Sequence, residues 1–175
     1  MRDTRHPGRI ARVHAQDESP LPGRRVRGLV LPALLAELLA SGRWQHPGDE
    51  VIRAALPWFE DPVDFLSTDR MERESRSLDL YADDEASSRA FLVTRGSTAG
   101  KTWLPWLDAE AAVLIAVNRR PGDDVAIALD YRNDATDPAV VASDAWTWTY
   151  PSAYLWRPVA PTFEAFAAML GTLSA

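Results

Sequence analysis

The amino-acid sequence predicts an α+β fold, with N-terminal helices packed on a mostly antiparallel sheet of about five or six strands, closed by a C-terminal helix. Helical periodicity dominates the first half of the chain. Short apolar segments separated by Pro, Asn and Asp follow in the second half. A last segment after Thr162 returns to helical spacing. Helices and strands segregated in this way are typical of the α+β class.

The length and the absence of cysteine limit the possible architectures. A chain of 175 residues favours one domain, which we place at residues 27–175 behind a flexible tail at residues 1–26. Without cysteine there are no disulfides, thiolate nucleophiles or zinc–thiolate sites, which fits a cytoplasmic location. We therefore expect a cytoplasmic domain that folds without a cofactor.

The charge is unevenly distributed. Residues 1–27 carry seven arginines against three acids, or +4, and residues 28–175 carry 12 basic against 22 acidic residues, or −10. Such an acidic body argues against nucleic-acid binding and suits either solubility or a basic partner. Residues 24–41 resemble a signal peptide, but Glu37 interrupts the apolar run. No segment approaches the roughly 18 apolar residues of a membrane span, so we expect no membrane contact.

Two helices are predicted first. One covers residues 31–41, with Pro32 in its first turn and Gly42 as its C-cap. Its apolar face consists of Leu34, Leu35, Leu38 and Leu39. The second covers residues 48–56 and has acidic residues near its N-terminus. An apolar cluster is expected next, around the turn at Asp61. Its members are Trp58, Phe59, Phe65 and Leu66.

A third helix is predicted at residues 67–80, with an exposed charged face. Ser67 or Thr68 would cap it, and Glu72 would pair with Arg76 one turn later. A short strand, residues 91–94, follows.

The centre of the sheet is predicted from residues 111–117, an unbroken apolar run, and residues 125–131. The second segment would place Val125, Ile127, Leu129 and Tyr131 on one face. The intervening residues, 118–124, are turn formers. Further strand candidates are residues 138–143, 145–150 and 154–159. A final helix is expected with Thr162 as N-cap, ending at Gly171. Its apolar face would consist of Phe163, Phe166 and Leu170.

Residues 96–102, GSTAGKT, look like a phosphate-binding loop after a strand. The motif requires four residues between its glycines, and this chain has three. Pro105 also disfavours a helix immediately behind the loop. We interpret the segment as a surface loop.

Catalytic groupings are weak in this sequence. There is no G-x-S-x-G motif, and no histidine follows His46, whose only metal-ligand combination would be with Asp49 and Glu50. An acidic group surrounds the central strands, but its members sit at opposite strand ends. They are Asp123, Asp124, Asp130, Asp134 and Asp137. We interpret them as turn formers, with a partner-facing acidic rim as the alternative.

Trp146, Trp148 and Tyr150 are spaced two apart and would share one strand face, with Thr147 and Thr149 on the other. Such a cluster can be core, a ligand cleft or a protein-binding patch. The spacing alone does not decide between core, ligand cleft and protein-binding patch.

The C-terminal half resembles the SUKH superfamily, which is related to the fungal Smi/Knr cell-wall regulators. The resemblance covers about residues 100–172 well and residues 28–80 loosely. The stretches that carry it are LPWLD at 104–108, LIAV at 114–117, PGDD at 121–124, IALDYR at 127–132, DPAVV at 137–141 and WRPVAPTFEAF at 156–166. The chain departs from the family in having no glycine after Trp103 or Trp106.

The resemblance implies a non-enzymatic binding protein, of the immunity type that neutralises a cognate toxin in bacterial polymorphic toxin systems. The toxin would be a basic nuclease or deaminase, and the chain a monomer or weak dimer. We expect Trp146, Trp148, Tyr150, Asp123 and Asp124 to contact it. One alternative is a regulatory scaffold without a toxin. The other is a small hydrolase or phosphate-binding protein.

Overall fold

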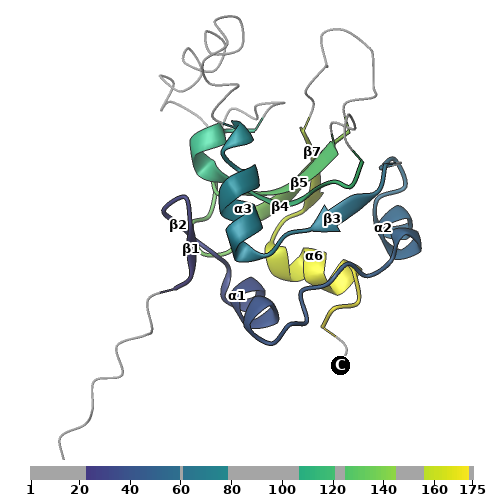
Figure 1. The fold of residues 1–175 in the computed structure, drawn as a ribbon, viewed down its shortest axis with the longest axis horizontal. Helices are drawn as coiled ribbons and strands as arrows, with labels where there is room; N and C mark the ends of the chain where they lie inside the picture. Colours follow the sequence, from purple (N-terminus) through teal and green to yellow (C-terminus); the bar gives the residue numbers. More distant parts are fainter. Residues whose placement is uncertain (1–22, 60, 79–106, 121–124, 145–155, 174–175) are drawn as a thin grey trace, which may run out of the picture.

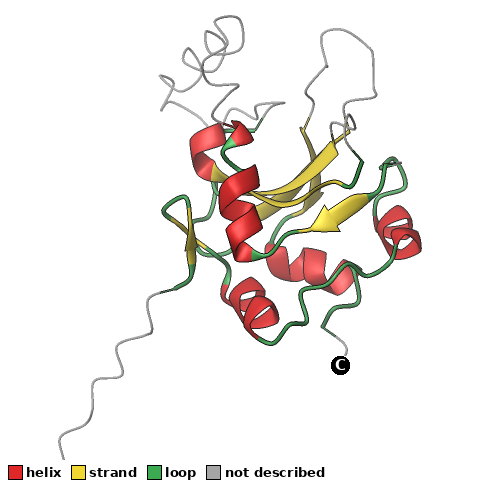
Figure 2. Cartoon of the chain, in the orientation of Figure 1, coloured by secondary structure: helices red, strands yellow, loops and turns green. Residues whose placement is uncertain are grey.

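The computed structural model describes residues 23–59, 61–78, 107–120, 125–144 and 156–173. Within them the fold is α+β, as the sequence predicts, with a two-stranded hairpin, a five-stranded antiparallel sheet and four α-helices (Figures 1 and 2). The elements are β1 Arg25–Val26, β2 Leu29–Val30, α1 Ala33–Ala40, α2 Asp49–Ala55, β3 Val63–Phe65, α3 Thr68–Glu74, a 3-10 turn at Ala109–Ala111, β4 Ala112–Asn118, β5 Val125–Asp130, β6 Ala139–Asp144, β7 Trp156–Ala160 and α6 Phe163–Met169.

The main sheet is a meander in the order β3-β4-β5-β6-β7, with every neighbouring pair antiparallel. β4 and β5 form the central pair that the sequence predicts, and β6 and β7 correspond to the candidates at residues 138–143 and 154–159. The other two strand candidates, residues 91–94 and 145–150, lie outside the described residues.

β4 is buried on both faces. Each side chain from Ala112 to Ala116 is at most 4% exposed, which explains why this strand is an unbroken apolar run and not an alternating one. A β-bulge interrupts its pairing with β5, because Leu114 lies opposite Ala128 while Ala116 lies opposite Ile127. The extra residue, Ile115, is fully buried.

The strand β3 was missed by the sequence prediction, which assigned Phe65 only to an apolar cluster. β3 pairs with the end of β4, with Val63 opposite Asn118 and Phe65 opposite Ala116. Three residues are too few for an alternating pattern to be recognised. The cluster itself is confirmed in part, since Phe59 and Leu66 are buried.

The predicted helix ends are largely confirmed. Thr162 Oγ1 accepts a hydrogen bond from the Ala165 N–H at 3.1 Å at the start of α6. Gly171 (φ 70°) and Gly42 (φ 71°) follow α6 and α1 in the left-handed conformation that favours glycine there. Ser67 caps α3. Pro32 is the residue before α1 and not a member of its first turn.

The helix α3 is less exposed than predicted. Met71 and Ser75 are fully buried against the sheet, and α3 packs on β4. The expected ion pair between Glu72 and Arg76 does not form between these two described residues. Instead, Glu72 Oε2 accepts a hydrogen bond from the backbone N–H of Arg27 at 2.7 Å.

Side chains from the hairpin β1–β2 and from the end of α3 bond to backbone groups of β4 that β3 is too short to reach. Its two-residue turn has φ 52° at Arg27 and φ 81° at Gly28, as expected of a tight hairpin. Arg27 Nη1 donates to the carbonyl of Ala112 at 3.3 Å, and the Leu114 N–H donates to Ser75 Oγ at 2.9 Å. Val26 is fully buried, so the last residues of the predicted tail belong to the fold.

Aromatic side chains join the helices to the sheet. The ring of Trp44 stacks on Phe65 with centroids 4.4 Å apart, and it meets Phe163 of α6 at 5.5 Å. Phe163 and Phe166 are fully buried on the face that the spacing predicts. In the part of the chain that the structure describes, no helix has the length and hydropathy to cross a membrane.

Candidate functional site

Arg119, immediately after β4, joins β3 and α2 at one end of the sheet. Its Nε donates to Asp64 Oδ1 at 2.9 Å, and its Nη2 donates to the carbonyl of Val63 at 2.9 Å. Two further contacts, at 3.2 and 3.3 Å, reach the carboxylate of Asp49. The hydrogen bond and charge of Arg119 hold the pKa of Asp49 below its usual value. The guanidinium therefore ties together three elements that are distant in sequence.

His46 is held in one neutral tautomer beside this network. Its Nδ1 accepts the N–H of Gly48 at 3.1 Å, so the ring proton is on Nε2, which lies 3.4 Å from Asp49 Oδ1. Burial, and then the charge of Arg119, lower the pKa of His46, although Asp49 and Asp64 act in the opposite direction. Both ring nitrogens are engaged, which leaves His46 poorly suited to proton transfer.

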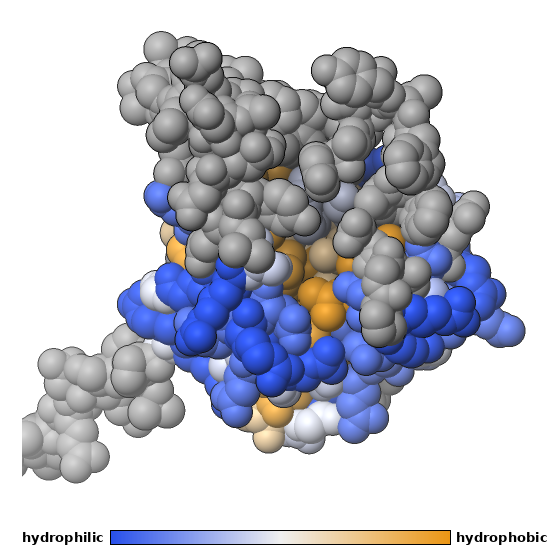
Figure 3. Space-filling view, turned by 45° about the horizontal axis from the view of Figure 1, so that its top comes forward, coloured by the Kyte–Doolittle hydropathy of each residue, from blue (hydrophilic) through white to orange (hydrophobic). Residues whose placement is uncertain are grey.

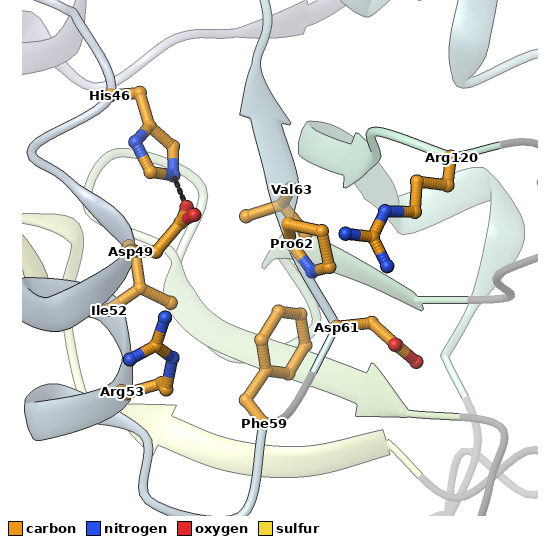
Figure 4. A pocket seen from close by; sticks show the side chains of 9 residues that line it. All are labelled: His46, Asp49, Ile52, Arg53, Phe59, Asp61, Pro62, Val63 and Arg120. Carbon is orange, nitrogen blue, oxygen red and sulfur yellow. Dashed lines mark ion pairs between the residues drawn. The ribbon is translucent and has the colours of Figure 1, made fainter.

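A pocket opens between α2 and the start of β3 (Figure 4). Its volume is about 190 Å³. The lining residues are His46, Asp49, Ile52, Arg53, Phe59, Asp61, Pro62, Val63 and Arg120. The floor is apolar, since Ile52, Phe59 and Val63 are at most 4% exposed. Figure 4 shows Arg53 and Arg120 on opposite sides of the Phe59 and Pro62 rings.

The charges around this pocket are not balanced. Asp49 and Asp64 are matched by Arg119 and by Arg70, which lies 3.8 Å from Asp64. Arg53, Arg120 and Asp61 form no ion pair within the described parts of the chain. The lining carries two arginines and two aspartates, but Asp49 is already engaged by Arg119, so Arg53 and Arg120 remain against one carboxylate, that of Asp61. Such an arrangement can hold an anion.

The predicted partner-binding residues, Asp123, Asp124, Trp146, Trp148 and Tyr150, lie outside the described residues. The strand ends that flank them are described, and they are neighbours. Val125, at the start of β5, pairs with Asp144 at the end of β6. Ser143 pairs with Trp156 at the start of β7.

The other aspartates of the predicted acidic group have structural roles, in line with the turn interpretation. Asp130 is buried and forms a bidentate ion pair with Arg132. Asp134 Oδ1 accepts the N–H groups of Thr136 and Asp137, and these bonds lower its pKa. Asp137 Oδ1 accepts the N–H of Phe163 at 3.1 Å at the start of α6. These carboxylates do not converge on a common ligand.

Two further sequence candidates can be compared with the structure. Among the described residues, no group of three or more His, Asp or Glu side chains is arranged to hold a metal ion. His46 and Asp49 do come together, but the carboxylate of Asp49 is bound by Arg119. The phosphate-loop-like segment, residues 96–102, is outside the described residues.

The sequence prediction missed the arginines that line and flank the pocket. Arg119 and Arg120 belong to the predicted turn at residues 118–124, and Arg53 belongs to the predicted helix at residues 48–56. Neither pattern indicates which residues these arginines contact. Asp64 is 55 positions away from Arg119. The sequence does single out two lining residues, His46 and Asp49, but only as a weak metal-ligand combination with Glu50.

Comparisons with known proteins add no assignment, since no family model, no curated protein and no solved structure matches this chain.

Proposed function

We propose that this chain is a non-enzymatic protein-binding domain of the immunity type, which binds and neutralises a cognate toxin of a bacterial polymorphic toxin system. The proposal starts from the resemblance to the SUKH superfamily in residues 100–172. The α+β fold, with a central antiparallel sheet and a closing helix, is compatible with that resemblance.

The observation that carries the proposal is the position of four strand ends. Residues 119–124 connect β4 to β5, and residues 145–155 connect β6 to β7. The pairings of Val125 with Asp144 and of Ser143 with Trp156 bring the ends of these connections together at one end of the sheet. The acidic and aromatic residues predicted to contact the toxin are thus tethered to neighbouring strands. A single partner surface could reach both segments.

The polar chemistry of the described residues also favours binding over catalysis. His46 is engaged through both nitrogens, and the Asp49 and Asp64 carboxylates share Arg119. The described surface in Figure 3 is mainly hydrophilic, with hydrophobic areas near the centre of the view and at its edges. The excess of 22 acidic over 12 basic residues in residues 28–175 suits a basic nuclease or deaminase, because complementary charge speeds association.

Co-expression tests the proposal directly. The toxin encoded next to this chain's gene is expressed with and without the tagged chain. We expect the chain to restore growth and to co-purify with the toxin as a defined complex. Loss of growth in both cultures, together with the absence of a complex, would rule out the immunity function. A stable complex with a non-toxic host protein would indicate the scaffold alternative.

Paired variants locate the contact surface. We expect W146A/W148A and D123N/D124N to weaken the complex, because interface aromatics and complementary charges dominate affinity and association rate. The matched control is T147A/T149A, which changes the opposite face of the same predicted strand. Equal binding by all three double variants would exclude Trp146, Trp148, Asp123 and Asp124 from the interface.

A further inference from the structure

The pocket beside α2 lies at the same end of the sheet as the proposed binding surface. Val63, which lines the pocket, pairs with Asn118 at the end of β4. Arg120 follows two residues later, directly before the segment that contains Asp123 and Asp124. A partner that contacts this end of the sheet would therefore lie next to the pocket.

The size of the pocket limits what it can hold. Its volume of about 190 Å³ is below the range of roughly 300–1,000 Å³ usual for sites that bind metabolites or drugs. A single amino-acid side chain is a better match for this space than a cofactor. The walls are protein side chains from α2, the following loop and the end of β4.

The chemistry of the lining selects the kind of side chain. Because Asp49 is paired with Arg119, the lining leaves Arg53 and Arg120 against the single carboxylate of Asp61, which favours one further negative charge. Planar guanidinium groups bind carboxylates through two parallel hydrogen bonds. The buried floor of Ile52, Phe59 and Val63 would contact the methylene groups of an acidic side chain and exclude water. Arg53 and Arg120 are both exposed in the free chain, so an ion pair here would be strengthened only when a docked partner covers it.

We propose that the pocket between Arg53 and Arg120 receives the carboxylate of an aspartate or glutamate side chain presented by the protein partner. This rests on the proposed function, and it adds the chemistry of one contact. A basic partner surface would meet the acidic residues of this chain, and one acidic side chain within that surface would enter the pocket. Opposite charge pairs at neighbouring positions fix the register of two proteins as they dock.

A capped amino acid tests the pocket without the partner. The chain is labelled with ¹⁵N and titrated with N-acetylglutamate methylamide at constant ionic strength, with N-acetylglutamine methylamide as the neutral control. We expect saturable shifts of the Arg53 and Arg120 signals with the glutamate probe only. Equal, non-saturating shifts with both probes would overturn the proposal. Acetate binding as tight as the glutamate probe would overturn the assignment to a side chain.

Variants connect the shifts to the two arginines. We expect R53Q/R120Q to weaken the glutamate probe at least about tenfold, as expected when charge-assisted hydrogen bonds are lost. R73Q is the matched control, because Arg73 is exposed and paired with Glu74 on α3. Undiminished binding by a folded R53Q/R120Q protein, judged from its dispersed spectrum, would overturn the proposal.

The partner complex separates this proposal from the proposed function. If the toxin is neutralised and R53E/R120E leaves its affinity unchanged, the pocket proposal fails and the immunity function remains. If no toxin is neutralised but the glutamate probe saturates the pocket, the immunity function fails and the carboxylate site remains. If the immunity function and the carboxylate pocket are both correct, R53E/R120E weakens the complex at least about tenfold.

Discussion

The guanidinium of Arg119 donates to Asp64 at 2.9 Å and so connects the end of β4 to the short edge strand β3. The same group reaches Asp49 at the first position of α2. One side chain thereby fixes the relative position of a strand end, an edge strand and a helix. The shape of the pocket depends on this arrangement.

We expect R119Q to lower the midpoint of thermal unfolding, by less than the truncation of a core side chain. The arginine side chain is 38% exposed, so its ion pairs are partly screened by water. The difference from the wild type should shrink at high salt, where exposed pairs weaken. R43Q is the control, since Arg43 forms a single exposed pair with Glu37. An R119Q protein as stable as R43Q at low salt would contradict the structural role of Arg119.

His46 makes stability depend on pH in a defined direction. Its pKa is lowered in the folded protein from the ordinary value of 6.5, so the unfolded chain takes up the proton first as the pH falls. The contribution of the neutral ring is therefore complete above pH 6.5, and is lost as the pH falls from there toward the folded-state pKa. Urea unfolding at about pH 7.5 and about pH 5.5 measures this loss.

The variant H46N is the test for that assignment. Its side-chain oxygen can accept the Gly48 N–H in place of Nδ1, but it does not titrate. We expect H46N to lose less stability between the two pH values than the wild type. Asp49, whose pKa is lowered from 3.8, affects stability only in the more acidic range. The same pH dependence in both proteins would show that another group is responsible.

Ser75 is a buried polar residue whose side chain binds a backbone N–H of β4. Its Oγ accepts the N–H of Leu114, in a stretch of β4 that β3 does not cover. We expect S75A to cost about 1–3 kcal/mol of unfolding free energy, because a buried N–H loses its partner. S77A, which changes an exposed serine on the next turn, should stay within about 0.5 kcal/mol of the wild type. Chemical denaturation measures both, and equal stability would contradict this role.

Phe163 anchors α6 in the core. It is fully buried between Trp44 and Phe166, so F163A should cost about 3–5 kcal/mol. The control on the same helix is M169A, since Met169 is 44% exposed and its truncation should stay within about 0.5 kcal/mol. A small effect of F163A in chemical denaturation would mean that α6 is not packed as described.

Local patterns were sufficient for much of the fold. The apolar run of β4 and the apolar residues on one face of β5 identified the sheet centre, and Thr162 with Gly171 bounded α6. The strand β3 was missed because its identity depends on pairing with β4, which lies far along the chain. Arg27 and Glu72 meet for the same reason, across 45 positions, and this contact replaces the expected helical pair.

Less of the candidate site than of the fold could be predicted from the sequence. The pocket is made of residues that look ordinary one at a time: an exposed arginine on α2, a turn arginine after β4, and a Pro-containing loop. Only the fold brings them around a common space. The aspartates, by contrast, were interpreted correctly where they are described, because Asp134 makes its turn contacts within three residues.

The meander order of the sheet also has a kinetic consequence. β4 pairs with β5, and β5 with β6, across short connections, whereas β3 joins β4 only after a long loop has closed. Loop closure of this length is entropically unfavourable and tends to come late in folding. The contact between Arg119 and Asp64 should therefore be absent from the folding transition state. Its loss would accelerate unfolding and leave the folding rate nearly unchanged.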